Sequence, residues 1–560
     1  MIYRKEIDGL RALAVIPVIL FHAGFKSFSG GYIGVDVFFV LSGYLITSII
    51  LAEKEAGNFS FTQFYERRAR RILPALFFVM AVCIPFAWLL MFDPLQFKQF
   101  SASLVSVTLF VSNIQFWQES VYFGPAAELK PLVHTWSLAI EEQYYLVFPV
   151  FMVVFWSWGK RWLVIMVSLV ALFSLLCAQL SGNLTIYPPY IESHFLWFNQ
   201  SNLASFYLPT GRVWTLLVGV LVAFFLHSNP QIKRRANNGA SFLGLFLITY
   251  SVFSFDSTTP YPSVFTLLPS IGAALIIVFA TPNTVVYNLL SHKGLVGIGV
   301  ISYSSYLWHQ PLFAFFRLII SEEPSLWLMG LLSVISLVLG YFSWLFIERP
   351  FRDKLKVSRK KIFKSGVLAS LFFISFGLIS FFGFEKMRFS ERSISYLNQY
   401  EGLEIAKPFY LKKCGFPVPQ QIIDEKCYMP DDNQDTVLLW GDSYAQALGY
   451  GLRKNFGETY FFAQVASASC RPALNFNDYK TQDSRKKDAF CDKSNAFATS
   501  LIKSSPIKSI IFAQNNGHNY TDWEKMATFA RENGVKDIYL VGPPPQWSLS
   551  LPYVVAYYEL

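Results

Sequence analysis

Apolar stretches of about twenty residues recur along this 560-residue chain as far as Phe384, and this is the length a helix needs to cross the hydrocarbon core of a bilayer. Hydrophobic residues make up 53% of the sequence, and 56 residues are Phe. Both figures exceed those of a typical soluble domain. The sequence therefore predicts a polytopic α-helical membrane domain.

The chain turns polar after Phe384, with many Lys, Asp, Asn and Ser, and we see no later segment long enough to span a membrane. We expect a membrane domain over residues 1–355, a linking transmembrane helix and linker over residues 356–400, and a soluble domain over residues 401–560. The soluble part is long enough to bury a core of its own.

Basic residues in the loops set the expected orientation, because cytoplasmic loops of membrane proteins are enriched in Lys and Arg. The basic clusters all fall on the cytoplasmic side if the chain crosses the membrane eleven times. Residues 98–118 are also apolar, but a crossing there would invert the later basic loops, so we expect a re-entrant or surface helix. The clusters are Arg4–Lys5, Arg67–Arg71, Lys160–Arg161, Lys233–Arg235 and Arg349–Lys364.

The eleven expected spans cover residues 8–26, 32–52, 72–92, 137–158, 161–180, 209–227, 240–255, 264–281, 296–320, 326–347 and 363–384. An odd number of spans with a cytoplasmic N-terminus places the polar domain outside. The net charge of +10 then reports topology and gives no reason to expect nucleic acid. The first apolar segment lacks a small-residue cleavage site, so we expect no cleavable signal peptide.

Arg11 and His22 lie eleven residues apart in the first span. At about 100° per residue this spacing returns nearly to the same azimuth with a rise of about 16 Å, so both side chains should look into one groove at different depths. Polar groups at membrane depth usually serve a function. The alternative is that Arg11 snorkels to the cytoplasmic headgroups while His22 is a hydrogen-bonded core residue, and spacing alone does not decide between them.

Several motifs follow in order over roughly residues 1–355. They are Arg11 with His22, Gly34–Ile46 (GVDVFFVLSGYLI), Arg67–Pro74 (RRARRILP), His134–Gln143 (HTWSLAIEEQ) and Ser305–His309 (SYLWH). This series resembles the acyltransferase-3 family of membrane proteins. The resemblance implies an O-acyltransferase that modifies extracytoplasmic carbohydrate, and it implies that Arg11 and His22 are essential.

The six cysteines divide between the two parts of the chain. Cys83 and Cys177 lie in apolar spans, where packed thiols are expected, and the other four lie in the polar domain. An even number in an oxidising compartment favours disulfides, and among three connectivities we choose the pairing of neighbours. A zinc site is the rival, although no CxxC knuckle or His pair accompanies these residues. The expected pairs are Cys414 with Cys427 and Cys470 with Cys491.

Strand-like and helix-like runs alternate in the polar domain, with apolar runs at residues 436–440, 509–513 and 537–542. This alternation predicts a parallel, doubly wound, flavodoxin-like sheet whose site lies at the carboxyl ends of the strands. Gly441-Asp442-Ser443 ends the first strand and opens a helix, where backbone N–H groups and the helix dipole stabilise an oxyanion. The alternative for Ser443 is a helix N-cap.

In this context Gly441-Asp442-Ser443 resembles the first block of the SGNH hydrolase and acyltransferase domains that are often fused to acyltransferase-3 proteins. The resemblance implies a catalytic role for Ser443 with Asp442 beside it. The sequence departs from the family at the other blocks. Residues 466–470 lack the oxyanion Gly, residues 514–517 supply Asn515 outside the usual Gly-x-Asn, and the closing Asp-x-x-His is absent.

His518 is the only His after Ser443, so either it is the recruited base or the domain is truncated before its base. We expect truncation, because the last strand and helix of the sheet are also missing.

Other polar residues of the membrane domain each have two interpretations. His309 is either a second proton carrier or a structural hydrogen-bonding group. Glu141 and Glu142 are expected near the outer face beside His134, where capping and interface roles compete with catalysis. Arg212, at an outer helix start, is a candidate contact for a sugar or a lipid phosphate. The basic residues Arg67, Arg68, Arg70 and Arg71 either bind the phosphates of coenzyme A or only report topology.

These features lead to the prediction of an O-acetyltransferase of cell-surface polysaccharide, resembling those that decorate lipopolysaccharide O-antigen. The resemblance implies acetyl-CoA as cytoplasmic donor, no metal, a lipid-linked or surface polysaccharide acceptor, and a multi-pass protein of the bacterial inner membrane with a periplasmic C-terminal domain. His22 would act as general base or transient acyl carrier, and acetyl would pass through Ser443 to a sugar hydroxyl. The alternatives are a transporter of acyl groups or glycans with an outer binding domain and an outer-face carbohydrate esterase.

Overall fold

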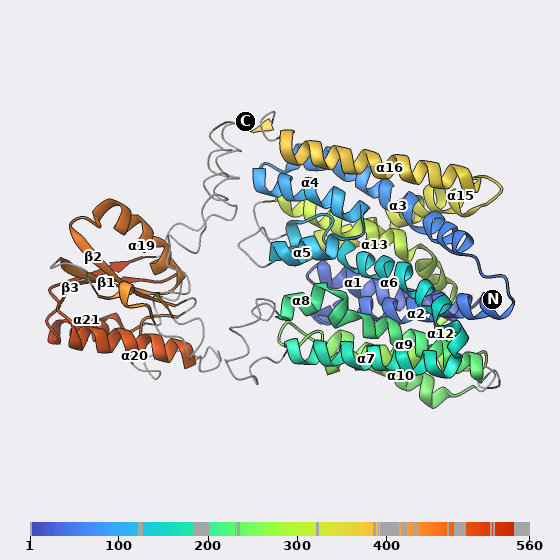
Figure 1. Ribbon diagram of the computed structural model, residues 1–560, viewed down its shortest axis with the longest axis horizontal. Helices are drawn as coiled ribbons and strands as arrows, with labels where there is room; N and C mark the ends of the chain where they lie inside the picture. The colour runs from blue at the N-terminus through green and yellow to red at the C-terminus, as the bar shows by residue number, and fades with distance from the viewer. Residues whose placement is uncertain are drawn as a thin grey trace. The chain divides into compact units, whose positions relative to one another are not determined.

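The computed structural model divides the chain into two compact units, a helical unit within residues 1–390 and a unit with a sheet within residues 391–552 (Figure 1). Each is described by itself. The structure describes residues 3–120, 127–182, 201–229, 231, 236–320, 324–384, 388–389, 391, 414–415, 423–429, 434–467, 470–474, 489–515, 518 and 521–542.

The helical unit is a bundle in which many helix axes run side by side (Figure 1). Its helices are α1 (Lys5–His22), α2 (Gly34–Glu55), α3 (Phe61–Leu90), α4 (Pro94–Thr108), α5 (Ser112–Ser120), α6 (Thr135–Val154), α7 (Lys160–Gly182), α8 (Ser201–Tyr207), α9 (Pro209–Ser228), α10 (Asn238–Ser254), α11 (Leu267–Phe279), α12 (Val285–Leu290), α13 (Lys293–Ile319), α14 (Leu326–Ser343), α15 (Arg349–Arg352) and α16 (Arg359–Ile379).

Among the described residues, seven helices are long and apolar enough to cross a membrane by length and composition, namely α2, α3, α6, α7, α9, α14 and α16 with their flanks. Two shorter apolar helices cover Asn238–Ser254 and Val264–Phe279. The other two predicted spans coincide with α1 and α13, and α1 is less apolar because its first seven residues include four charged ones. Each of the eleven predicted segments is therefore helical, and the chain is a multi-pass membrane protein.

Residues 98–118 do not form one long helix. Helices α4 and α5 are separated at Leu109–Val111, where Phe110 adopts a positive φ of 55°. Neither helix has the roughly twenty residues that a crossing needs. This break agrees with the expectation that the segment does not span the membrane.

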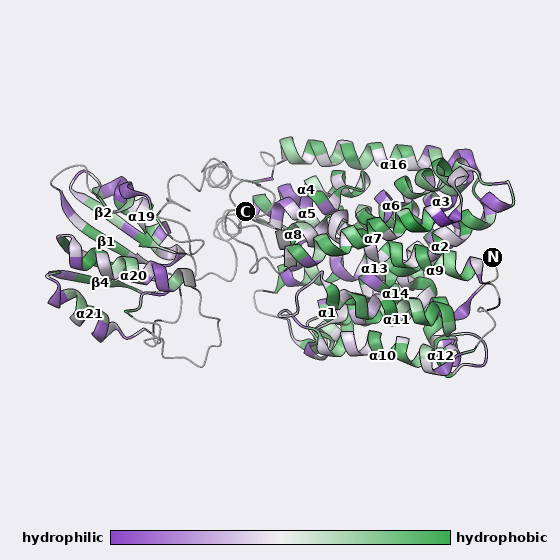
Figure 2. Cartoon of the chain, turned by 60° about the horizontal axis from the view of Figure 1, so that its bottom comes forward, coloured by the Kyte–Doolittle hydropathy of each residue, from purple (hydrophilic) through white to green (hydrophobic). Residues whose placement is uncertain are grey.

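Large apolar side chains cover the outside of the helical unit. They are exposed along α7, α10, α14 and α16, for example at Phe173, Phe246 and Leu371. Figure 2 shows the same helices as predominantly hydrophobic. Exposed apolar surface of this extent is costly in water and is what lipid contact requires.

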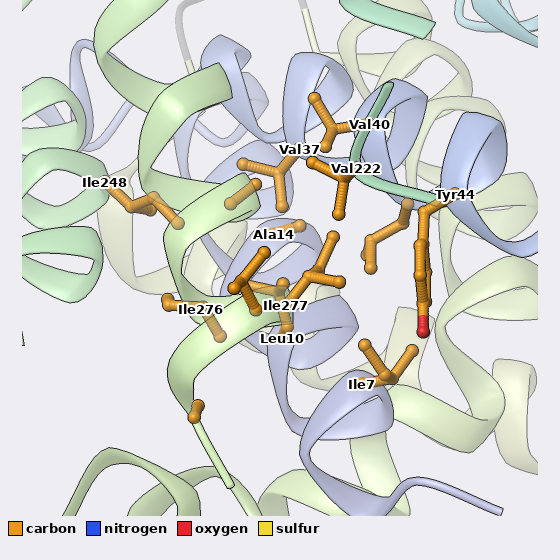
Figure 3. Close-up of a cluster of buried hydrophobic side chains, with 14 of the residues drawn as sticks. Ile7, Leu10, Ala14, Val37, Val40, Tyr44, Val222, Ile248, Ile276 and Ile277 are labelled. Atoms are coloured by element: carbon orange, nitrogen blue, oxygen red, sulfur yellow. The ribbon is translucent and has the colours of Figure 1, made fainter. Parts of the chain in front are cut away.

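The interior of the bundle holds a cluster of buried aliphatic side chains from α1, α2, α9, α10 and α11, and residues such as Leu10, Val40 and Ile277 converge in it (Figure 3). Helices α2 and α9 approach closely because each offers a glycine to the other. A Cβ at Gly43 would lie 1.9 Å from the Leu216 carbonyl oxygen, and one at Gly219 would lie 2.0 Å from that of Val40.

The second unit has a four-stranded parallel sheet in the order β2-β1-β3-β4. The strands are β1 (Asp435–Gly441), β2 (Tyr460–Ala466), β3 (Ile507–Ala513) and β4 (Asp537–Val541), and the helices are α19 (Ser443–Phe456), α20 (Ala489–Ser504) and α21 (Trp523–Glu532). Apolar residues of α20 and α21 pack on one face of the sheet, and those of α19 pack on the other. The predicted doubly wound parallel sheet is confirmed.

Both expected disulfides are present, Cys414–Cys427 and Cys470–Cys491. Cys83 is a buried free thiol and Cys177 a partly exposed one, as expected for the membrane domain. One expectation was wrong in detail. The basic residues at 67–71 lie within α3, which begins at Phe61, rather than in a loop before a span. The cluster at residues 233–235 lies outside the described residues.

Candidate active site

A cavity of about 810 Å³, part of it open to solvent, lies between α1, α2, α3, α6 and α13. Along α2 its lining runs from Val35 to Ile46, which corresponds to about 16 Å of helix at 1.5 Å per residue. Three guanidinium groups line one part of it, the basic end, and the hydroxyls of Ser137 and Tyr306 line another part, the hydroxyl end next to His134.

Three arginines line the basic end, and their hydrogen-bond and ion-pair partners differ. Arg11 donates to the Asp8 carboxylate across 2.9 Å, and this pair orients it on α1. Arg68 lies over the Tyr145 ring, and its buried Nε has no hydrogen-bond partner among the described residues. Arg71 also lines the cavity, and among the described residues it has no ion-pair or hydrogen-bond partner. Unpaired guanidinium groups in a cavity favour an anionic ligand.

The other two arginines of the predicted phosphate-binding set do not line this cavity. Arg70 is buried, pairs with Glu66 at 2.9 Å and donates to the Phe351 carbonyl. Arg67 pairs with Glu53 at 2.9 Å. The structure therefore brings only Arg68 and Arg71 of the predicted set to this cavity, because protein carboxylates hold Arg67 and Arg70.

The structure also corrects the expected position of the two glutamates. Glu141 and Glu142 lie about two turns into α6, which begins at Thr135, and not beside His134 at its start. Glu141 lines the cavity with Arg11 and Arg68 and accepts a hydrogen bond from Ser42 at 2.7 Å. Its carboxylate thus faces the basic end.

Beyond the hydroxyl end of the cavity lie three histidines from three separate elements. The His309 ring, on α13, is 5.2 Å from that of His22 at the end of α1 and 5.3 Å from that of His134 just before α6. His309 and His134 are almost wholly buried. Their Nε2 atoms have no hydrogen-bond partner among the described residues.

The Nδ1 of His22 lies 2.9 Å from the Val18 carbonyl oxygen, which only accepts, so this nitrogen carries a proton. When the ring is neutral, Nε2 is then the nitrogen with a free lone pair. His22 is therefore in the form that a general base or a nucleophile needs. The Arg317 guanidinium donates to the His22 backbone carbonyl at 2.7 Å and anchors the end of α1.

Tyr306 separates the cavity from the histidines. It lines the cavity, its ring is 5.2 Å from those of His134 and His309, and its hydroxyl donates to the His134 carbonyl at 2.9 Å. The Ser137 hydroxyl lies 2.8 Å from the Tyr306 hydroxyl. Arg11 lines the cavity, whereas His22 is not among its lining residues and contacts His309.

Sequence reasoning did not single out Tyr306, Ser137 and Ser42. All three occur inside the quoted motifs, two of them beside His309 or His134 in the chain. A periodicity of three to four residues from those histidines would have placed Tyr306 and Ser137 on the same helix faces.

Arg212 has no exposed surface, which excludes the expected contact with a sugar or lipid phosphate in this conformation. It pairs with the fully buried Asp36 at 3.3 Å and lies over the rings of Trp136, Phe206 and Tyr261. The Tyr261 hydroxyl also donates to Asp36. This arrangement is a structural ion pair that joins α2 to α9.

In the second unit, Asp442 and Ser443 lie where β1 ends and α19 begins. The buried Asp442 carboxylate accepts hydrogen bonds from the backbone N–H of Tyr444 and of Asn515, each at 2.8 Å. Burial raises the pKa of this carboxyl, and the two N–H groups oppose the rise. Asp442, not Ser443, is therefore the residue that caps α19, and Ser443 stands at its first position.

All three predicted blocks meet at the carboxyl edge of the sheet. Asn515 follows β3 and contacts Asp442 through its backbone, while Ser467 follows β2 and donates its N–H to the Gly441 carbonyl at 3.1 Å. Residues 468–469 and 516–517 of these blocks lie outside the described residues. The strand-to-helix turn at Ser443 is where an α/β domain places its site.

His518 lies near the end of β4, where its Nε2 is 3.3 Å from the Val541 carbonyl. No hydrogen bond joins it to Ser443 within the described part of this unit. In neither unit do the described residues contain a group of three or more His, Cys, Asp or Glu that could hold a metal ion.

Comparison with known proteins identifies the class. Residues 4–347 match the acyltransferase domain family, so the chain belongs to this family of membrane proteins. Residues 413–557 match the SGNH domain that is fused to such domains. The chain therefore joins a helical acyltransferase membrane domain to an SGNH domain with a parallel sheet.

Two curated relatives illustrate the similarity. The chain is 31% identical over 377 residues to the peptidoglycan O-acetyltransferase OatA of Listeria monocytogenes, which is 65% of this chain and 58% of the relative. It is 30% identical over 363 residues to the O-acetyltransferase OatA of Staphylococcus aureus, which is 63% of this chain and 58% of that protein. The chain thus matches little more than half the length of these relatives.

Proposed function

We propose that this chain is an O-acetyltransferase that moves acetyl from cytoplasmic acetyl-CoA to a sugar hydroxyl of a cell-surface polysaccharide. Relatives named O-acetyltransferases support the reaction type. The observation that carries the proposal is the cavity that leads from Arg11, Arg68 and Arg71 to hydroxyl groups beside a histidine cluster.

The basic end of the cavity suits the phosphates of coenzyme A. Two of its arginines have guanidinium nitrogens without a partner among the described residues, and a phosphate would supply the missing acceptors. The pantetheine arm would then lie along α2, and the thioester would reach the end lined by Tyr306 and Ser137. The Tyr306 hydroxyl now donates to the His134 carbonyl, and it would turn from there to the thioester to stabilise the oxyanion that forms when the carbonyl is attacked.

His22 is the general base in this scheme. Its Nε2 takes the proton of the attacking hydroxyl, the hydroxyl oxygen bonds to the thioester carbon, and the C–S bond breaks to release the thiolate. The acceptor is either the sugar itself or Ser443, which then passes acetyl to the sugar. The orientation that this requires, with the N-terminus cytoplasmic and the second unit outside the inner membrane, is part of the proposal.

The acceptor we propose first is lipopolysaccharide O-antigen, as the sequence motifs imply. Peptidoglycan is a second candidate, because it is the acceptor in the name of the Listeria relative. Cells that make both polymers and express the chain would be given labelled acetate, and the two polymers would be separated and their ester-bound label counted.

Label in O-antigen that disappears in the His22→Ala strain supports the first acceptor, and label in peptidoglycan supports the second. Label in neither polymer, with the protein present in the membrane, contradicts acetyl transfer. Acetyl groups lost from pre-labelled polymer would indicate the esterase instead. An unmodified glycan that moves across the membrane would indicate the transporter.

A further inference from the structure

The helix that follows α13 changes its winding near its end. After α14 the chain makes one π-helical turn, Trp344–Glu348, and then continues as α15. π-helical turns are rare, and they occur frequently at functional sites. Before this turn Tyr341 and Phe342 are large exposed side chains, whereas Glu348 at its end is fully buried. The turn therefore brings a carboxylate into the bundle.

The Glu348 carboxylate has two partners. Its Oε2 accepts from the Ser304 hydroxyl at 2.9 Å, and its Oε1 accepts from Nη2 of Arg352, one turn further along the chain. Ser304 follows Tyr303, which lines the cavity, so this carboxylate lies close to the cavity wall. Nε and Nη1 of Arg352 have no partner among the described residues, and the side chain is 40% exposed. Arg352 thus has N–H donors that a solute can reach.

Arg352 lies next to the basic end of the cavity. Arg70 on α3 donates to the Phe351 carbonyl at 3.0 Å, and this bond holds α15 beside α3 (Figure 1). Arg352 follows Phe351 in the chain, and Arg71, which lines the cavity, follows Arg70. The guanidinium of Arg352 interacts electrostatically with those of Arg71 and Arg11. These like charges repel one another, and an anion with several charges would offset that repulsion.

The proposed donor carries phosphate at two positions, a diphosphate next to the pantetheine arm and a phosphate monoester on the 3′ carbon of the ribose. Arg11, Arg68 and Arg71 line the cavity beside the space proposed for pantetheine, so they match the diphosphate. Arg352 is four residues beyond Glu348, about 6 Å along a helix, and is not among the residues that line the cavity. Its exposed side chain beside the basic end matches the phosphate that is farther from the thioester.

We infer that Arg352 binds the 3′-phosphate of the coenzyme A donor and that Glu348 positions it, an inference that rests on the proposed function. Arg352 would then determine donor specificity, because it distinguishes coenzyme A thioesters from thioesters that lack this phosphate. It touches neither the thioester nor the acceptor, so it acts on binding of the donor and not on the chemical step.

The test uses the full chain, purified in detergent, with initial rates of transfer from acetyl-CoA and from acetyl-3′-dephospho-CoA. For the parent, we expect KM for the dephospho donor to exceed that for acetyl-CoA by about 10–100-fold, the range for one charge-assisted contact. Arg352→Ala should raise KM for acetyl-CoA by the same factor and leave KM for the dephospho donor, and kcat for both, within about threefold. Discrimination between the donors is then lost.

Three further variants separate this contact from a general effect of charge. Arg349→Ala is the matched control, because Arg349 lies in the same short helix but over the Trp344 ring, and it should keep the parent's discrimination. Arg71→Ala should raise KM for both donors, since both carry the diphosphate. Glu348→Gln still accepts from Ser304 but no longer pairs with the charge of Arg352, and it should lower the discrimination by at least about threefold. Thermal melting of each variant checks the fold.

Three results would overturn the inference: a parent whose KM values for the two donors agree within twofold, an Arg352→Ala variant that raises both KM values equally, or an Arg349→Ala variant that loses discrimination as Arg352→Ala does. The first of these needs no variant, so the inference stays testable even if a substitution prevents folding. A parent that transfers acetyl from neither donor would refute the proposed function, whereas one that uses both equally refutes only the role of Arg352.

Discussion

Arg67 and Arg71 lie one turn apart on α3, yet their guanidinium groups have different surroundings. Arg67 is paired with Glu53, whereas Arg71 faces the cavity with no partner that the described residues provide. A paired guanidinium on the surface of a helix contributes little, but one that meets a phosphate in a cavity contributes directly to binding. The two residues therefore form a matched pair for testing the donor site.

Replacing Arg71 with Ala should raise KM for acetyl-CoA by about 10–100-fold, because one charge-assisted contact to an anion contributes about 1.5–3 kcal/mol. Replacing Arg67 with Ala should change it less than threefold. Steady-state rates at varied acetyl-CoA give both values. Equal effects of the two substitutions would show that the cavity does not bind the phosphates.

The role of Ser443 is tested against that of His518. A serine nucleophile loses several orders of magnitude of activity without a base, and the His518 ring is bonded to the Val541 carbonyl rather than to Ser443. We therefore expect His518→Ala to change glycan acetylation less than threefold. Acetylation assays of the parent, Ser443→Ala and His518→Ala decide the matter, and an active parent with a silent His518→Ala variant would assign the base to His518.

At the level of elements, helix packing depends on a few positions where a side chain does not fit. A Cβ at Gly43 on α2 would lie 1.9 Å from the Leu216 carbonyl oxygen on α9, which is backbone and cannot turn aside. Gly219 makes the reciprocal approach to Val40. These helices also carry Asp36 and Arg212, so their spacing sets the buried ion pair.

Gly43→Ala should therefore destabilise the membrane domain by about 1–3 kcal/mol, the usual cost of overpacking. Gly297→Ala is the control, because a Cβ at Gly297 in α13 meets nothing within 4 Å and Ala favours a helix. Thermal unfolding in detergent measures both. A Gly43→Ala protein as stable as the control would show that α2 and α9 adjust without cost.

At the scale of the whole molecule, the two disulfides bear on the side of the membrane that the second unit occupies. Cys414–Cys427 and Cys470–Cys491 are both within it, while the described helical unit holds only free thiols. Disulfides persist in oxidising compartments and are rare in the cytosol. They agree with the orientation proposed from the basic loops.

Single cysteines test that orientation. In a variant without Cys83 and Cys177, Asn58→Cys after α2 and Glu532→Cys in α21 both lie at exposed positions. We expect an impermeant thiol reagent to label only Glu532→Cys in cells opened at the outer membrane, and to label both after lysis. Labelling of Asn58→Cys before lysis would contradict the eleven-span orientation.

Local patterns in the sequence were sufficient for much of the fold. The eleven apolar segments are helical, residues 98–118 are broken, and Asp442 and Ser443 stand between a strand and a helix. Each of these depends on contacts between residues near in sequence, or on the length of an apolar run, which a pattern of residues records directly.

The membrane site was predicted only in part. Arg11 and Arg68 line the cavity and His22 lies beside it, but Arg70 and Arg212 are held in buried ion pairs with Glu66 and Asp36. Their partners are not evident from the sequence alone. For Arg212 the partner is far away in the chain, and for Arg70 the rotation of α3 decides whether the side chain faces ligand or protein.

The sequence by itself determined which segments are helices, where the chain changes from membrane to soluble composition, and which residues carry titratable groups at membrane depth. Only the tertiary structure decided that His22, His309 and His134 form one cluster, with Tyr306 between them and the cavity. The physical reason is that periodicity fixes the face of a helix on which a residue lies, whereas the neighbours of that face depend on how helices distant in sequence pack against one another.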